Sequence, residues 1–445
     1  MTVRDDANDL RTRKRPQIPQ LKLTHASCAR WLLPADSAGG GEIRSLDGVR
    51  AIAALSIVLF HTLLIYHVEY LPISQHAGAV WYYLSTGVQL FFVLSGFLLF
   101  RPYARAILSG ATLPGWARFY QRRALRILPV YWVALTVALV AQWRIVGKPL
   151  WLNAFSHILL IHDSFPRYNR DIDGPFWTLA VEAQFYLLLP LIAWGIARVV
   201  GRSQSRARLV GALLGVIALA EGLRWLDTLL MPSVTWQALA HGGGEAARYI
   251  FVLATMGMQG KSYEIFFIGA LCATIYVMAI EHEGVARHMQ RRLSWLLLGG
   301  GVALSVLAAP AWRLGAWMFT PGMRWGWDII LYPLVVGLSF AACTLGIVWG
   351  HPAVRRIFEA PALRFFGHIS YSIYVWHLPI LQGAIPPFGL MPVWQRLIWV
   401  FVVSYLSYQL LERPFLRSRQ RLHQRTIESQ PQTDADTQPD LAGAR

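Results

Sequence analysis

An arginine and a histidine in the first long apolar stretch are the residues whose types and spacing best suit a chemical role. Arg50 and His61 lie eleven positions apart in the run LDGVRAIAALSIVLFH. On an α-helix this separation gives a rise of about 16 Å and a net rotation of about 20°, so both side chains share one face. A guanidinium can hold a phosphate, and an imidazole can act as a general base. The pair suits an anionic reagent that binds near Arg50 and reacts near His61; a snorkelling arginine and a structural histidine are the alternative.

A carboxylate in another apolar stretch points to the same kind of site. Glu182 lies within FWTLAVEAQFYLLLP, and Thr178 lies one helical turn before it on the same face. A carboxylate inside a membrane needs a partner, which His61 or an arginine could supply. Beside an imidazole it would orient the ring and raise its basicity. The alternative is a polar clamp between two helices.

A basic cluster precedes the third apolar stretch, in ARFYQRRALRILPVYW. Arg118, Arg122 and Arg126 share a helical face, and Arg123 lies on the adjacent one. Such a stripe at a membrane surface can bind the phosphates of a cofactor or anionic lipid headgroups, or it can serve only to set the topology. Composition by itself favours the lipid or topological interpretation.

Four further positions are candidates for a polar chamber. Tyr374 and His377 lie at helical neighbour spacing in FFGHISYSIYVWHLPI, and His377 is near the middle of the predicted span. Ser95 precedes a glycine in GVQLFFVLSGFLLF, a pair that favours close helix packing. Asp47, one turn before Arg50, is expected to orient that arginine.

Long apolar segments must position all these residues. The chain has 445 residues, of which 55% are hydrophobic and only 15% are charged. This composition excludes an ordinary soluble enzyme and predicts an all-α, polytopic membrane protein. About twenty apolar residues are needed to cross a bilayer, which predicts ten transmembrane helices. They are expected at 46–66, 80–100, 127–143, 176–200, 209–230, 263–282, 293–311, 327–349, 366–384 and 393–411.

The distribution of charge predicts the orientation of these helices. The formal net charge is +17, and most of the 41 lysine and arginine residues lie at the termini or in alternate connecting segments. The positive-inside rule therefore places both termini in the cytoplasm. Because the basic residues fall in short clusters between apolar runs, no nucleic-acid partner is expected. The apolar stretch 151–161 is too short to cross and is predicted to be re-entrant or interfacial.

The remaining segments carry little chemistry. Residues 1–43 are predicted to be a disordered basic cytoplasmic arm, without a cleavable signal peptide, and 417–445 a disordered cytoplasmic tail. The transmembrane domain is expected to span 44–416. Cys28, Cys272 and Cys343 show neither metal-ligand spacing nor a disulfide framework, so no metal is expected.

Six blocks in matching order give the chain a resemblance to the acyltransferase 3 family of integral membrane acyltransferases. They are LDGVRAIAALSIVLFH, VQLFFVLSGFLL, FYQRRALRILPVY, FWTLAVEAQFYLL, ISYSIYVWHLPI and LERPF. The resemblance implies a ten-helix membrane fold that transfers an acyl group, commonly acetyl from cytoplasmic acetyl-CoA, to a hydroxyl of a carbohydrate or related acceptor.

The resemblance also assigns roles to individual residues. The family's Arg-ten-residues-His motif falls on Arg50 and His61. Its basic loop falls on Arg122, Arg123 and Arg126, which the resemblance makes ligands of the CoA phosphates. Its Tyr-x-x-His element falls on Tyr374 and His377, and its Trp-Ser-Leu-x-x-Glu block ends at Glu182.

The last of these blocks departs from the family pattern. Thr178 and Ala180 replace serines, and Ala183 replaces a second acidic residue, so Glu182 is the one carboxylate available there. Many relatives carry a soluble hydrolase-like domain after the membrane region, which this sequence does not contain. Transfer is therefore expected to finish within the membrane domain or through a separate extracytoplasmic partner.

The hypothesis from sequence is an O-acyltransferase of the bacterial cytoplasmic membrane that uses acyl-CoA and a carbohydrate or glycolipid acceptor. His61 would be the general base or, alternatively, an acyl carrier, and Glu182 would orient it or relay protons. Asp47, Ser95, Thr178, Tyr374 and His377 are expected to line the chamber. The rival is a proton-coupled transporter or flippase, since intramembrane histidine and glutamate residues also form proton relays. The acceptor, the acyl chain length and the oligomeric state stay open.

Overall fold

The structure is a computed structural model that describes residues 43–65, 83–142, 150–164, 172–230, 261–281, 287–315 and 327–416. These residues belong to one folding unit, Ile43–Arg445. The described residues are helices joined by turns, with no β-strand among them, which confirms the all-α class. The arm predicted at 1–43, apart from Ile43, and the tail predicted at 417–445 lie outside the described residues.

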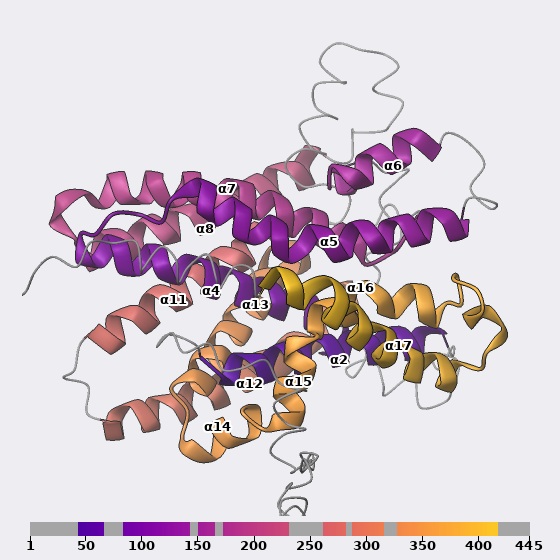
Figure 1. Cartoon of the computed structure of the whole chain (residues 1–445). Helices are drawn as coiled ribbons and strands as arrows, with labels where there is room; N and C mark the ends of the chain where they lie inside the picture. The colour runs from indigo at the N-terminus through magenta and orange to yellow at the C-terminus, as the bar shows by residue number, and fades with distance from the viewer. Residues whose placement is uncertain are drawn as a thin grey trace, which may run out of the picture. The chain divides into compact units, whose positions relative to one another are not determined.

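The helices follow one another along the chain as Figure 1 shows. Their bounds are α2 (Ser45–Ile65), α4 (Gly87–Ser109), α5 (Trp116–Gln142), α6 (Leu150–Ile158), α7 (Phe176–Val200), α8 (Arg206–Leu230), α11 (Tyr263–Glu281), α12 (Arg287–Gly315), α13 (Trp327–Val348), α14 (Pro352–Phe358), α15 (Pro361–His368), α16 (Ser370–Leu381) and α17 (Val393–Ser407). Short 3-10 turns lie at His162–Ser164, Gly201–Ser203 and Phe388–Leu390, and a π-helical turn, η7, at Tyr408–Glu412.

Five of the described helices are long and apolar enough to cross a membrane, so the chain is a multi-pass membrane protein. They cover Ser45–Ile65, Tyr83–Ser109, Trp116–Ala141, Phe176–Ser203 and Arg206–Leu226. A sixth crossing results if the pair Pro333–Val348 and Pro352–Phe358, which bends by 109°, counts as one span. The ten spans and the cytoplasmic termini expected from sequence stay predictions.

The basic cluster proved to be part of a spanning helix. The prediction ended the second span at residue 100 and began the third at 127, whereas α4 continues to Ser109 and α5 begins at Trp116. Gly110 ends α4, because its φ of 68° is a left-handed conformation that glycine adopts without strain. Arg122, Arg123 and Arg126 therefore lie in the first three turns of α5, where the helix fixes their directions.

The span predicted at 366–384 is not one continuous helix. The chain is helical from Pro361, breaks at Ile369 and resumes as α16 at Ser370. Ser370 Oγ donates a hydrogen bond of 2.8 Å to the carbonyl of Gly367 across this break. The stretch at 151–161 contains the nine-residue α6, which is too short to cross a bilayer, as expected.

Close helix packing fixes the position of α4. A Cβ built on Gly96 would lie 1.8 Å from the carbonyl oxygen of Phe266, and a Cβ on Gly269 would lie 2.2 Å from that of Val93. The backbones of α4 and α11 thus meet at two glycines, which confirms the packing role expected beside Ser95. Elsewhere in the unit, α2 packs against α4, α15 and α16, and α7 packs against α8 (Figure 1).

Candidate active site

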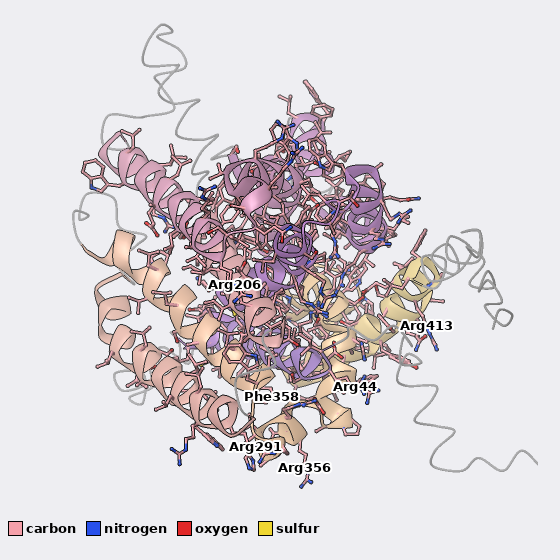
Figure 2. All side chains as sticks on the ribbon, turned by 90° about the vertical axis from the view of Figure 1, so that its left-hand side faces the viewer. Arg44, Arg206, Arg291, Arg356, Phe358 and Arg413 are labelled. Carbon is pink, nitrogen blue, oxygen red and sulfur yellow. The ribbon has the colours of Figure 1, made fainter. Side chains whose placement is uncertain are left out.

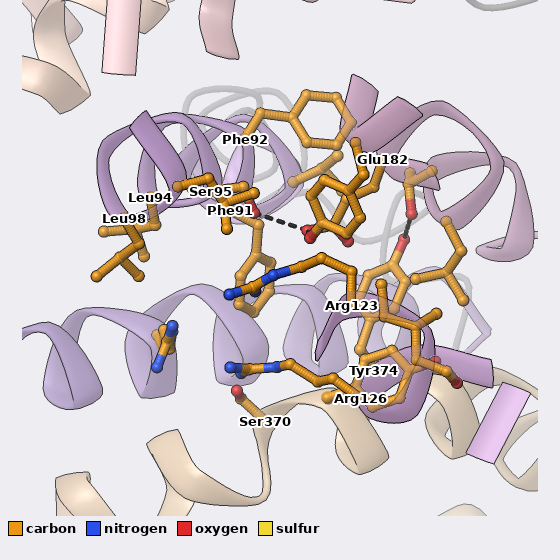
Figure 3. Close-up of a pocket in the computed structure, with 18 residues that line it drawn as sticks. Phe91, Phe92, Leu94, Ser95, Leu98, Arg123, Arg126, Glu182, Ser370 and Tyr374 are labelled. Atoms are coloured by element: carbon orange, nitrogen blue, oxygen red, sulfur yellow. Dashed lines mark hydrogen bonds between the residues drawn. The ribbon is translucent and has the colours of Figure 1, made fainter. Parts of the chain in front are cut away.

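A cavity of about 80 Å³ lies among α2, α4, α5, α7 and α16 (Figure 3). This volume admits several water molecules, since one needs roughly 10–15 Å³. Its polar lining residues are Arg50, Ser95, Arg123, Arg126, Thr178, Glu182, Tyr186, Ser370, Tyr371 and Tyr374. Its apolar lining residues are Val88, Phe91, Phe92, Leu94, Leu98, Leu99, Ile127 and Leu179.

Three arginines give the cavity a cationic wall. Arg50 comes from α2, and Arg123 and Arg126 come from successive turns of α5. Figure 3 shows the α5 guanidinium groups extending into the same space, with that of Arg126 beside Ser370. The Arg123 guanidinium lies 5.9 Å from the centre of the Tyr186 ring. Arg50 pairs with Asp47 at 3.5 Å, the orienting contact expected from their spacing.

Glu182 supplies the carboxylate of the cavity, and two hydroxyl groups hold it. Ser95 Oγ on α4 donates a hydrogen bond of 2.7 Å to Glu182 Oε1. The Tyr186 hydroxyl, one turn further along α7, donates to the same oxygen. The sequence suggested His61 or an arginine as the partner of this carboxylate; its hydrogen-bond partners are these hydroxyls.

A second pair of hydroxyls joins α7 to α16. Thr178 Oγ1 and Tyr374 Oη lie 2.5 Å apart, and each also lies within 3.1 Å of the carbonyl oxygen of Pro175. Both side chains are almost fully buried and both line the cavity. The serine usual in the family at the position of Thr178 would also carry a hydroxyl. In this structure the Thr178 hydroxyl makes hydrogen bonds.

His61 and His377 contact each other and do not themselves line the cavity. His377 Nε2 lies 3.2 Å from His61 Nδ1, and the ring centres are 5.0 Å apart. His377 is completely buried. Tyr374 connects this pair to the cavity, because its ring lines the cavity and lies 5.7 Å from the ring of His377.

Asp47 does not line the cavity and lies in a polar cluster beside Arg50. Its carboxylate is 3.7 Å from Arg364 Nε and 3.8 Å from His368 Nε2, in addition to its contact with Arg50. The backbones meet here too, since a Cβ on Gly367 would lie 2.0 Å from the carbonyl oxygen of Asp47. Asp47 thus joins Arg50 to α15.

The structure brings seven of the eleven predicted site residues to the cavity wall. These are Arg50, Ser95, Arg123, Arg126, Thr178, Glu182 and Tyr374. Asp47, His61, Arg122 and His377 do not line it. Arg122 does not line the cavity, although it lies one helical turn before Arg126 on α5.

The sequence analysis did not single out Tyr186 or Tyr371, and both line the cavity with Ser370. Tyr186 could have been identified from the sequence, since it follows Glu182 by four residues and so shares its helical face. The sequence indicated Ser370 and Tyr371 less clearly, only through their place in the same sequence block as Tyr374.

The arrangement suits an amphiphilic anion. Guanidinium groups match phosphate geometry, and the apolar wall can hold a less polar arm or an acyl chain. Among the described residues no group of three or more His, Cys, Asp or Glu side chains is placed to hold a metal ion.

Comparison with known proteins gives the chain a family. The chain is similar to the peptidoglycan O-acetyltransferase OatA of Listeria monocytogenes, with 23% identity over 411 residues that cover 84% of this chain and 56% of the relative. It is similar to YrhL of Bacillus subtilis, with 27% identity over 402 residues covering 84% and 54%. It is also similar to the O-acetyltransferase OatA of Staphylococcus aureus, with 22% identity over 394 residues covering 83% and 56%.

The chain spans about half the length of the curated relatives it matches. No solved structure matches it. The family model described as an acyltransferase domain matches residues 43–410, which include every residue of the cavity wall. The chain therefore belongs to the acyltransferase 3 family.

Proposed function

We propose that this chain is a membrane O-acyltransferase that moves an acyl group, in the simplest case acetyl, from acyl-CoA to a hydroxyl of a carbohydrate. The observation that carries the proposal is a cavity in which three guanidinium groups face an apolar wall, on the same helical unit as a pair of contacting histidines. Family membership and the O-acetyltransferase names of the relatives support it.

Acyl-CoA is the donor whose chemistry fits the cavity. Arg50, Arg123 and Arg126 would bind its phosphates by charge-assisted hydrogen bonds, and Glu182 would bind neutral donors of the same molecule or of the acceptor. The apolar residues of α4 would hold the less polar arm. Because Arg50 and His61 are separated by about 16 Å along α2, a donor anchored at Arg50 would extend toward the histidines.

His61 would serve as the general base. In the reaction it takes the proton from the acceptor hydroxyl while the oxygen attacks the thioester carbon. The carbon–sulfur bond then breaks, and the leaving thiolate takes up the proton as free CoA thiol. The acceptor gains an ester, and His61 returns to its neutral form.

The distribution of arginines supports an orientation with this donor on the cytoplasmic side. Figure 2 shows Arg44, Arg206, Arg291, Arg356 and Arg413 at one end of the helical unit, although they come from different segments. By the positive-inside rule this end would face the cytoplasm of a bacterium, where acyl-CoA is made. The acceptor would be a carbohydrate; the relative from Listeria monocytogenes is named for acting on peptidoglycan.

Purified protein in liposomes tests the proposal directly. Acetyl-CoA is added with peptidoglycan fragments or other carbohydrate acceptors, and both free CoA thiol and ester product are measured, beside a His61→Ala control. The proposal expects thiol release and ester formation that depend on His61. Equal rates in the His61→Ala variant, or no thiol release from any short-chain acyl-CoA by folded protein, would overturn it.

A further inference from the structure

The contact between His61 and His377 allows the hydrogen positions on both rings to be assigned. His377 Nδ1 lies 2.7 Å from the carbonyl oxygen of Tyr374. A carbonyl oxygen can only accept, so Nδ1 of His377 carries the hydrogen. A neutral imidazole has a single N–H, so Nε2 of His377 is an acceptor. That acceptor is the atom that lies 3.2 Å from His61 Nδ1.

The tautomer of His61 follows from the same reasoning. Its Nδ1 lies 3.0 Å from the carbonyl oxygen of Ile57 and 3.2 Å from Nε2 of His377. Both neighbours are acceptors, so Nδ1 of His61 carries its hydrogen and shares it between them. The lone pair of the neutral ring is therefore on Nε2, which makes Nε2 the nitrogen that can take up a proton.

We propose that His377 is a positioning residue for His61: it holds His61 in the tautomer with a basic Nε2 and stabilises the imidazolium that forms during transfer. This inference rests on the proposed function, in which His61 is the base. When Nε2 of His61 takes the acceptor proton, the Nδ1–H bond to His377 becomes charge-assisted and stronger. The arrangement resembles the way a carboxylate orients the histidine of a hydrolase triad, with a neutral ring in place of the carboxylate.

A neutral positioning group suits this location. His377 is completely buried in the middle of α16, where an isolated carboxylate would be costly. Two adjacent imidazoles can share one proton, but two adjacent imidazolium ions repel each other, so the pair carries at most one added charge. The sequence analysis gave the orienting role to Glu182, whose hydrogen bonds go to Ser95 and Tyr186 instead.

Two isosteric substitutions of His377 test the inference. In His377→Gln the side-chain oxygen reaches about where Nε2 lies, so it can still accept the His61 hydrogen. In His377→Asn the amide reaches only about as far as Nδ1, so it leaves the His61 hydrogen without this acceptor. We expect the Gln variant to keep kcat within about 10-fold of the parent and the Asn variant to lose roughly 100-fold or more. The KM for acetyl-CoA is expected to stay the same in both, because the cavity wall is unchanged. Equal kcat values for the two variants would overturn the proposal.

A spectroscopic measurement tests the tautomers independently of the reaction. Nitrogen-15 NMR of the labelled full chain in detergent micelles distinguishes protonated from unprotonated ring nitrogens. The expected result is protonated Nδ1 and unprotonated Nε2 on both rings, assigned with His61→Ala and His377→Gln. A protonated Nε2 on neutral His61 would refute the positioning role. Failure of the proposed function would look different: His61→Ala would then turn over acetyl-CoA at the parent rate, whatever the tautomers.

Discussion

Ser95 and Glu182 form a hydrogen bond of 2.7 Å that joins α4 to α7 inside the cationic cavity. Tyr186 donates to the same carboxylate oxygen, Oε1, so two hydroxyls from two helices fix the carboxylate. Neither bond involves Oε2. The carboxylate therefore lies in the same cavity as three guanidinium groups, and its hydrogen bonds go to hydroxyls rather than to an arginine.

The first prediction concerns the charge of Glu182. Glu182→Gln keeps the shape and an oxygen acceptor for Ser95 but removes the negative charge. We expect kcat to fall roughly 100-fold or more if the carboxylate relays a proton, with the same unfolding midpoint as the parent. Ser95→Ala removes one hydrogen bond, which is worth about 0.5–1.5 kcal/mol. It should therefore lower kcat by no more than roughly 10-fold. A steady-state assay of both variants compares them, and parental kcat in Glu182→Gln would contradict the prediction.

The second prediction separates two neighbouring arginines. Arg123→Ala removes a guanidinium from the cavity wall, whereas Arg122→Ala removes one that lies outside it. A charged hydrogen bond is worth about 1.5–3 kcal/mol, so Arg123→Ala should raise the KM for acetyl-CoA by roughly 10- to 100-fold. Arg126→Ala should behave in the same way. Arg122→Ala is the control, because it also removes one positive charge but leaves the cavity wall intact. If the KM for acetyl-CoA rises as much in Arg122→Ala as in Arg123→Ala, the cavity does not bind the donor.

Apolar length and the polar residues within it, together with the family resemblance, were enough to predict the helical class and seven of the ten polar residues that line the cavity. Arg50, Glu182 and Tyr374 were recognisable because each is costly inside a membrane unless it faces a polar chamber. The end of α4 was not predictable from hydropathy, since Arg101 and Arg105 lie in helical turns beyond the apolar run. Hydropathy marks what lies in lipid and does not mark where a helix stops.

The partners of the polar residues were also beyond the sequence. A single sequence shows that Glu182 needs a hydrogen-bond partner, but Ser95 lies 87 positions away and His377 lies 316 positions from His61. Those pairings depend on how α4 meets α7 and how α2 meets α16, which side-chain packing decides. The break at Ile369 fell inside the predicted span 366–384, although Gly367, His368 and Ser370 interrupt the apolar run there.

The third prediction concerns the packing of α4 on α11. Gly96→Ala would place a Cβ 1.8 Å from the backbone oxygen of Phe266, so the helices must separate. Overpacking of this kind costs about 1–3 kcal/mol and should lower the thermal unfolding midpoint in detergent. Gly211→Ala on α8 is the matched control, because a Cβ there meets nothing within 4 Å. It should leave the midpoint unchanged or raise it, since alanine favours a helix more than glycine does. An unchanged midpoint for Gly96→Ala would mean that the contact does not limit stability.

The fourth prediction links stability to the pH through a pair of stacked histidines outside the spanning helices. The ring centres of His157 and His162 lie 3.8 Å apart, and both rings are completely buried. Burial lowers the pKa of His157 from 6.5 to about 4. Burial and the neighbouring ring also lower the pKa of His162. Between about pH 4 and 6.5 the unfolded chain therefore binds more protons at these sites than the folded chain does.

The free energy of unfolding should accordingly be highest above pH 6.5 and fall as the pH decreases toward 4, because a lowered folded-state pKa stabilises the protein only where the ring is neutral. The slope is expected to be about 1.4 kcal/mol per pH unit for each histidine that only the unfolded state protonates. His157→Phe keeps a ring on His162 but cannot titrate, so its slope in this range should be shallower than that of the parent. Denaturant unfolding in micelles at a series of pH values measures both slopes, and identical slopes would show that His157 is not the titrating group.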